Sequence, residues 1–204
     1  MNTWDTIKDN NTLEKTAQAL TANGMQTLIV ENRNEAKKKI LDLIPQKAEV
    51  FTATSVTLDT IGVSSEIDTS ERYESVRNKL NSMNRETQSS EMQRIGSSPD
   101  WIIGSVHAVT EKGEVMIASN TGSQLAPESY GANHVIFVIG AQKIVNDIEE
   151  GFKRIYEHSL PLEAERARKA YGAPGSNVSK ILIINKEIKP ERITVILVKE
   201  VLGF

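Results

Sequence analysis

The sequence predicts an α/β protein, in which helices cover both faces of a mostly parallel sheet in a three-layer α/β/α arrangement. The segments 25–30 and 49–52 are expected to be short strands, and a segment with helical periodicity separates them. This alternation is typical of parallel sheets. The run 135–139 is apolar at every position, as in strands that are covered on both faces. We therefore expect the strand at 134–139 to lie deep in the sheet.

The first half of the chain contains two expected helices around the first strand. Leu13, Ala17 and Leu20 repeat at helical spacing, and the pattern stops at Asn23-Gly24, a typical helix C-terminus. Asn34 is expected to cap the second helix, and Pro45 ends it. The residues expected on its buried face are Ala36, Ile40, Leu43 and Ile44.

Residues 63–98 interrupt this rhythm because they are polar and rich in Ser, Glu, Asn and Arg. One amphipathic piece places four apolar residues on one face: Tyr73, Val76, Leu80 and Met83. We interpret the segment as a solvated helical excursion that packs on the sheet, with a mobile lid as the alternative. The whole chain, 1–204, is then expected to form a single domain.

The second half continues with expected strands at 101–105, 115–118 and 134–139. Asn146 or Asp147 is expected to cap a helix that has Glu149 or Glu150 near its third position. Its predicted buried stripe consists of Ile148, Phe152 and Ile155. A further helix begins near Pro161 and ends near Tyr171-Gly172. Two final strands, 181–185 and 193–199, are joined by a short link and are predicted to form a C-terminal antiparallel pair.

Composition excludes several classes of function. The 24 basic and 27 acidic residues are well mixed, so no electrostatic footprint for nucleic acid is present. Cysteine is absent, which excludes disulfides, thiol catalysis and iron–sulfur ligation by this chain. No apolar run reaches about 18 residues, so no membrane span is expected. The first residues lack the pattern of a signal peptide, which favours a cytoplasmic protein.

The densest group of polar residues lies around the expected strand ends between 100 and 140. His107 follows the strand at 101–105, with Thr110 and Glu111 close behind it. An imidazole near a carboxylate could act as a general base or as an electrophile. Glu111 also belongs to an ordinary turn sequence, Glu-Lys-Gly-Glu, so a purely structural role is the alternative for it.

The segment Ser119-Asn120-Thr121-Gly122-Ser123-Gln124 follows the strand at 115–118. Its small residues would let the backbone approach a ligand. Successive N–H groups and hydroxyls could then hold a phosphate or a carboxylate. Because Asn-Thr-Gly is also common in turns, the sequence leaves both interpretations open.

Other polar residues stand at positions where ligands of such sheets bind. Thr54 and Ser55 lie at an expected helix start, where an anion or simple N-capping would explain them. Gln142 and Lys143 follow the strand at 134–139. Arg166 and Arg168 could contact an anion or form salt bridges on a helix surface. The three histidines have no metal-ligand spacing, so no metal site is expected.

A series of motifs in the second half resembles the lactate utilization protein C family, whose members carry the LUD domain. The motifs are W-I-I-G-S-V-H-A-V-T-E-K-G, T-G-S-Q, V-I-F-V-I-G-A-Q-K-I-V, P-L-E-A-E-R-A-R and a closing L-G-F. The resemblance is dense from about residue 100 onward; before that, only the order of the elements agrees. The family's recurrent positions fall on His107, Thr110, Glu111, Thr121, Gly122, Ser123, Gln142 and Lys143.

The resemblance implies a CoA transferase-like fold, similar to that of ribose-5-phosphate isomerase and glucosamine-6-phosphate deaminase. It also implies a role in oxidising L-lactate to pyruvate together with two partner proteins, at least one of which carries iron–sulfur clusters. Since this chain has no cysteine, electron transfer would occur in a partner. Glu111 is the acid nearest to the position implied for the catalytic glutamate of the CoA-transferases.

Two hypotheses about function follow. In the first, the chain is an accessory subunit of a lactate-oxidising system that binds a small anion, without a cofactor of its own. In the second, it is a free-standing enzyme that acts on a phosphorylated or carboxylated metabolite, with His107 or Glu111 as acid and base. The sequence favours the first, and it leaves open the ligand, turnover by the chain alone and assembly into a homo-oligomer.

Overall fold

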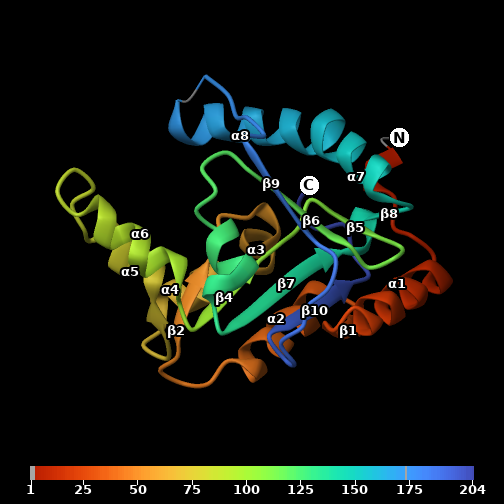
Figure 1. The fold of residues 1–204 in the computed structure, drawn as a ribbon, viewed down its shortest axis with the longest axis horizontal. Helices are drawn as coiled ribbons and strands as arrows, with labels where there is room; N and C mark the ends of the chain where they lie inside the picture. Colours follow the sequence, from red (N-terminus) through yellow and green to blue (C-terminus); the bar gives the residue numbers. More distant parts are fainter. Residues whose placement is uncertain (1–2, 173) are drawn as a thin grey trace.

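A computed structural model describes residues 3–172 and 174–204 of the chain. Its centre is a sheet of six strands in the order β1-β10-β7-β4-β2-β3, and every neighbouring pair runs parallel (Figure 1). In that order the strands are β1 (Gln26–Val30), β10 (Ile193–Val198), β7 (His134–Gly140), β4 (Trp101–Gly104), β2 (Glu49–Thr52) and β3 (Glu74–Ser75). The α/β class and the mostly parallel sheet that the sequence predicts are confirmed.

The strand β7 lies inside the sheet, between β10 and β4, as its unbroken apolar run predicts. Its register aligns Ile102 of β4 with Val135 and Gly104 with Phe137. Because all these strands are parallel, their carboxyl ends meet at one edge of the sheet. The segments that follow β2, β4 and β7 therefore come together there, which is where open α/β sheets bind ligands.

Three helices cover one face of the central sheet: α2 (Arg33–Leu43), α3 (Val56–Ile61) and α4 (Val63–Thr69). Ala36 and Ile40 of α2 are buried against it as expected, and so is Ile44, the C-cap residue, whereas Leu43 is only half-buried. The N-cap of α2 is Asn32 rather than the expected Asn34. Its side chain accepts hydrogen bonds from the backbone N–H groups of Asn34 and Glu35.

The opposite face is covered by α1 (Asn10–Ala22), by α5 (Val76–Asn81) and by a second sheet. After α5 the chain forms α6 (Ser89–Ser97), and Figure 1 shows α5 and α6 projecting together from the rest of the molecule. Tyr73 and Val76 are buried, while Leu80 and Met83 are half-buried. Because α5 packs against β2 and α6 against the segment 127–131, the excursion 63–98 forms one wall of the sheet's carboxyl edge.

The second sheet has four strands in the order β8-β5-β6-β9. These are β8 (Ile144–Val145), β5 (Ala108–Thr110), β6 (Val115–Ser119) and β9 (Lys180–Ile184). The predicted C-terminal antiparallel pair is wrong. β9 pairs antiparallel with β6 in this sheet, whereas β10 lies between β1 and β7 in the central sheet. The short link 186–191 thus connects two sheets instead of turning a hairpin.

A fourth layer covers the outer face of the second sheet. It consists of α7 (Ile148–Arg154), a π-helical segment at Ile155–Ser159 and α8 (Leu160–Tyr171) (Figure 1). Asp147 caps α7 by accepting from the N–H of Glu150. The predicted stripe is wrong at Phe152, which is 36% exposed. Ile155 is buried as predicted, and it shares the buried face with Gly151, Arg154, His158 and Ser159.

Three short segments complete the described elements: the 3-10 turns Thr3–Asp5 and Ala141–Lys143 and the π-helical turn Pro127–Gly131. Within the described ranges, no helix has the length and apolarity that a membrane crossing requires.

Candidate functional site

A pocket of about 1220 Å³ opens at the carboxyl edge of the central sheet. It lies between the segments that follow β2, β4, β6 and β7, with the α5–α6 excursion on one side and α8 on the other. Most of the candidate site residues that the sequence singles out line this pocket: Thr54, Ser55, His107, Ser119, Asn120, Thr121, Gly122, Ser123, Gln124, Lys143 and Arg166. The structure therefore brings most of the predicted site residues to one place.

His107 lies between β4 and β5 and is held by two hydrogen bonds. Its backbone N–H donates to the Met116 carbonyl, and its Nδ1 accepts the Ala118 N–H at 3.1 Å. Burial, with Lys143 and Arg154 nearby, lowers the pKa of His107 to about 3. The imidazole is therefore neutral at neutral pH, and its proton sits on Nε2. In this state the side chain offers a hydrogen-bond donor to the pocket.

Lys143 is buried at the end of the turn that follows β7, with 2% of its surface exposed. Its Nζ donates to Thr57 Oγ1 at 3.1 Å, to Ser105 Oγ at 3.1 Å and to the Val106 carbonyl at 3.0 Å. An ammonium group has three donors, and all three of these acceptors are uncharged. Burial and the nearby Arg154 lower the pKa of Lys143 well below its usual value. A negative charge beside Lys143 would oppose that effect.

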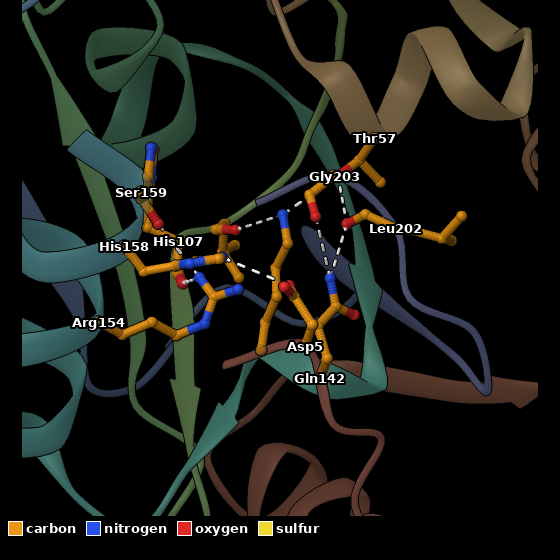
Figure 2. Close-up of polar contacts among 11 residues, drawn as sticks. Asp5, Thr57, His107, Gln142, Arg154, His158, Ser159, Leu202 and Gly203 are labelled. Carbon is orange, nitrogen blue, oxygen red and sulfur yellow. Dashed lines mark hydrogen bonds and ion pairs between the residues drawn. The ribbon is translucent and has the colours of Figure 1, made fainter. Parts of the chain in front are cut away.

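Arg154 lies behind His107 and is fully buried. Figure 2 shows its side chain extending from the helix toward His107, with Ser159 beside it. Its Nη1 donates to the His107 carbonyl and to Ser159 Oγ, whereas Nε and Nη2 have no hydrogen-bond partner among the described residues. Burial lowers the pKa of Arg154 to about 10, and Asp5 opposes this shift. The guanidinium remains charged and adds positive potential beneath His107.

The loop 119–124 is held mainly by its own hydrogen bonds. The Gly122 N–H donates to Ser119 Oγ at 2.9 Å, and the Ser123 N–H donates to Thr121 Oγ1 at 3.4 Å. Gly122 has a φ of +87°, in the left-handed region that favours glycine. Both N–H groups are thus occupied in this conformation. The loop supplies a wall and hydroxyl groups to the pocket rather than the expected row of free N–H donors.

Three predicted residues lie elsewhere. Thr110 is the last residue of β5 and Glu111 follows it, and both are absent from the lining of the pocket because the strand carries them away from His107. Thr110 is bonded to Glu114 in the tight turn that packs on α1. Gln142 donates to the carbonyls of Leu202 and Gly203 at 3.0 and 3.2 Å and so anchors the final residues (Figure 2). The structure gives Glu111 no place in the pocket.

The remaining predicted residues have local partners. Ser55 caps α3 by accepting from the Leu58 N–H, and Thr54 accepts from Arg77. Arg166 lines the pocket and forms two hydrogen bonds with Glu163, at 2.7 and 2.8 Å. Arg168 is absent from the lining. In the described part of the chain, no three His, Asp or Glu side chains converge as a metal site would require.

Sequence reasoning missed two buried charged residues, Arg154 and Glu128. The positions Gly151, Arg154, Ile155, His158 and Ser159 follow helical spacing, so polar residues on that face were a usable signal. Glu128 lines the pocket from the π-helical turn and is fully buried. Nothing in the local sequence Pro-Glu-Ser-Tyr distinguishes it from a surface turn.

Comparison with known proteins places this arrangement in a family. The model of the LUD domain matches residues 13–198. The chain belongs to the LUD domain family. A search among curated proteins finds no match.

The crystal structure of a DUF162 family protein from Deinococcus radiodurans is similar to this LUD domain protein, with a TM-score of 0.58. The similarity covers 95% of this chain and 99% of that one, at 12% sequence identity. At this identity the comparison shows the shared fold alone.

Proposed function

We propose that this LUD domain protein binds a small carboxylate, of the L-lactate or pyruvate type, between His107 and Lys143. It would serve as an accessory subunit of a system that oxidises L-lactate, with the redox chemistry in iron–sulfur partner proteins. Membership of the LUD domain family supports this proposal, and so does the absence of cysteine from the chain.

The observation that carries the proposal is a pair of buried basic side chains, Lys143 and Arg154, that are not paired with a carboxylate among the described residues. Neither Lys143 nor Arg154 forms a salt bridge in the part of the chain that the structure describes. Buried charges in proteins are normally paired, because desolvation makes an isolated charge costly. A ligand carboxylate would supply the missing charge. The Nε2–H of neutral His107 would donate to a carboxylate or carbonyl oxygen of the ligand.

The geometry gives less support to a free-standing acid–base enzyme. That hypothesis relied on His107 or Glu111 to transfer protons. Glu111 lies outside the pocket lining, and the pKa of about 3 keeps His107 unprotonated at neutral pH. A neutral imidazole that polarises a bound group suits binding and orientation of a ligand.

Calorimetric titration of the purified protein with L-lactate, pyruvate and inorganic phosphate tests the binding step. We expect saturable binding of the carboxylates. Lys143→Met should weaken it by about tenfold or more, because it removes the positive charge that attracts the carboxylate (about 1.4 kcal/mol per factor of ten). Lys112→Met removes an exposed lysine far from the pocket and should bind as the parent does. Thermal unfolding shows whether each variant is folded.

The proposal fails if a folded Lys143→Met variant binds these anions as well as the parent does, or if the parent binds none of them. The partner role has a separate test, in which cysteine-rich iron–sulfur proteins encoded beside this gene reduce a dye with L-lactate as electron donor. We expect the rate to depend on this chain. An equal rate without it would contradict the accessory role.

A further inference from the structure

Glu128 is the one described residue whose carboxyl group is fully buried and has no hydrogen-bond partner for either oxygen. It belongs to the π-helical turn Pro127–Gly131 and lines the pocket. A buried polar group without hydrogen-bond partners is destabilising, because it has lost its hydration without gaining another partner. Such groups in native proteins are rare and often mark functional positions.

The surrounding chain holds this carboxyl group in place without bonding to it. Arg192 donates to the backbone carbonyls of Pro127, Glu128 and Ala132 at 2.9, 3.1 and 3.0 Å, and its charge is paired with Glu187 at 2.7 Å. The charge of Arg192 is therefore already paired and does not neutralise Glu128. Arg192 therefore fixes the backbone of the turn 127–131 and makes no hydrogen bond with the Glu128 carboxyl group.

Gly104 makes the space for this side chain at the end of β4. A Cβ atom built on Gly104 would lie 2.7 Å from Glu128 Oε1, closer than real contacts allow. Gly104 itself is buried. A residue with any side chain would push the carboxyl group out of its position, so the pair Gly104–Glu128 forms one local arrangement.

The protonation state of Glu128 defines the chemistry that it offers. Burial raises the pKa of its carboxyl group well above the usual value, and no nearby cation opposes this effect. The neutral acid presents one O–H donor beside one C=O acceptor. An amide or lactam presents the complementary N–H and C=O on adjacent atoms. An ammonium group would require the ionised form, which burial disfavours.

We propose that Glu128 and Gly104 form a second subsite of the pocket, which binds an uncharged amide or lactam group of an extended ligand. The inference rests on the proposed function in one respect: the anionic group of that ligand would occupy the His107–Lys143 end. The pocket of about 1220 Å³ exceeds the volume of a small carboxylate many times, and binding pockets of about 300–1,000 Å³ usually hold drug-sized ligands. A ligand with two separated polar groups uses both ends.

Ligand-observed NMR with acetamide as the probe tests this subsite. We expect saturable binding to the parent protein. Glu128→Leu should abolish it, whereas Glu128→Gln, which keeps an N–H donor beside a C=O acceptor, should bind within about threefold of the parent. Gly104→Ala should weaken binding by about tenfold, since its Cβ displaces the carboxyl group (1.4 kcal/mol per factor of ten). Glu14→Gln, an exposed change on α1, is the matched control.

The subsite is contradicted if the parent does not bind acetamide, or if folded Glu128→Leu binds it unchanged. The subsite is also contradicted if the parent binds methylammonium instead of acetamide and Glu128→Gln loses that binding. Such a result would show that the carboxyl group is ionised. Thermal unfolding shows whether each variant is folded. If Gly104→Ala does not fold, acetamide binding by Glu128→Leu still tests the subsite. Titration with L-lactate separates the two proposals: acetamide binding without lactate binding would refute the proposed function alone.

Discussion

Two features of its surroundings keep His107 in the neutral form. Its Nδ1 accepts a backbone N–H, and two buried cations lie nearby. Each of these disfavours a second proton on the ring, so the pKa falls to about 3. The side chain is then a fixed, neutral donor at neutral pH, which suits recognition of an anion without a titration step.

This state of His107 predicts a specific pH dependence of stability. Between about pH 6.5, the ordinary value for histidine, and pH 3, the unfolded chain binds a proton at this position and the folded chain does not. The contribution of His107 to the free energy of unfolding is therefore fully present above pH 6.5 and is lost as the pH falls through this window.

Urea unfolding of the parent and of His107→Asn from pH 7 to pH 4 measures that contribution. Asn keeps an acceptor for the Ala118 N–H and cannot titrate. We expect the parent to lose stability faster than the variant on acidification. Since His158 is present in both proteins, its own titration largely cancels in the difference. Parallel curves would show that His107 titrates normally in the folded state.

The helix α7 and the π-helical segment Ile155–Ser159 pack against the second sheet with a face that includes polar residues. Gly151 allows this close packing, because a Cβ atom there would lie 2.2 Å from Met116 Sδ. Met116 is itself fully buried and has little room to move. The position of Arg154 one turn later therefore depends on the small size of residue 151.

Gly151→Ala should destabilise the protein by about 1–3 kcal/mol through overpacking, although alanine is the better helix former. Gly96→Ala in α6 is the control, because its Cβ would meet Leu80 at an ordinary 3.7 Å. That variant should be unchanged or more stable by up to about 1 kcal/mol. Chemical denaturation of both variants gives the comparison. A stabilised Gly151→Ala would show that the helix does not pack as closely as described.

At the scale of the whole molecule, local patterns predicted the elements better than their partners. The apolar run of β7 indicated an interior strand correctly, because burial on both faces removes any alternation. The same reasoning failed for β9 and β10. Their short link is compatible with a hairpin or with a step between two sheets, and only the pairing of β9 with β6 decides which one forms.

The site shows the same limit. The ends of the strands at 101–105 and 115–118 predicted that His107 and Thr121 to Ser123 would line one pocket, provided that both strands belong to one sheet. The strands β4 and β6 lie in different sheets, but their ends still meet at this pocket. Glu111 was misplaced because the three residues of β5 carry it away from His107. Arg154 comes from helix α7 and Glu128 from the turn Pro127–Gly131, and the burial of both side chains depends on packing against distant parts of the chain.

The central claim is that neutral His107 donates from Nε2 to a small anion held beside Lys143. Imidazole ¹⁵N NMR of the labelled protein at pH 7, titrated with pyruvate, tests it most directly, and the spectrum of His107→Asn assigns the resonance. We predict a neutral ring with its proton on Nε2, whose Nε2 resonance shifts saturably as pyruvate binds. A doubly protonated ring at pH 7, or an Nε2 resonance that saturating pyruvate leaves unmoved, would contradict the account.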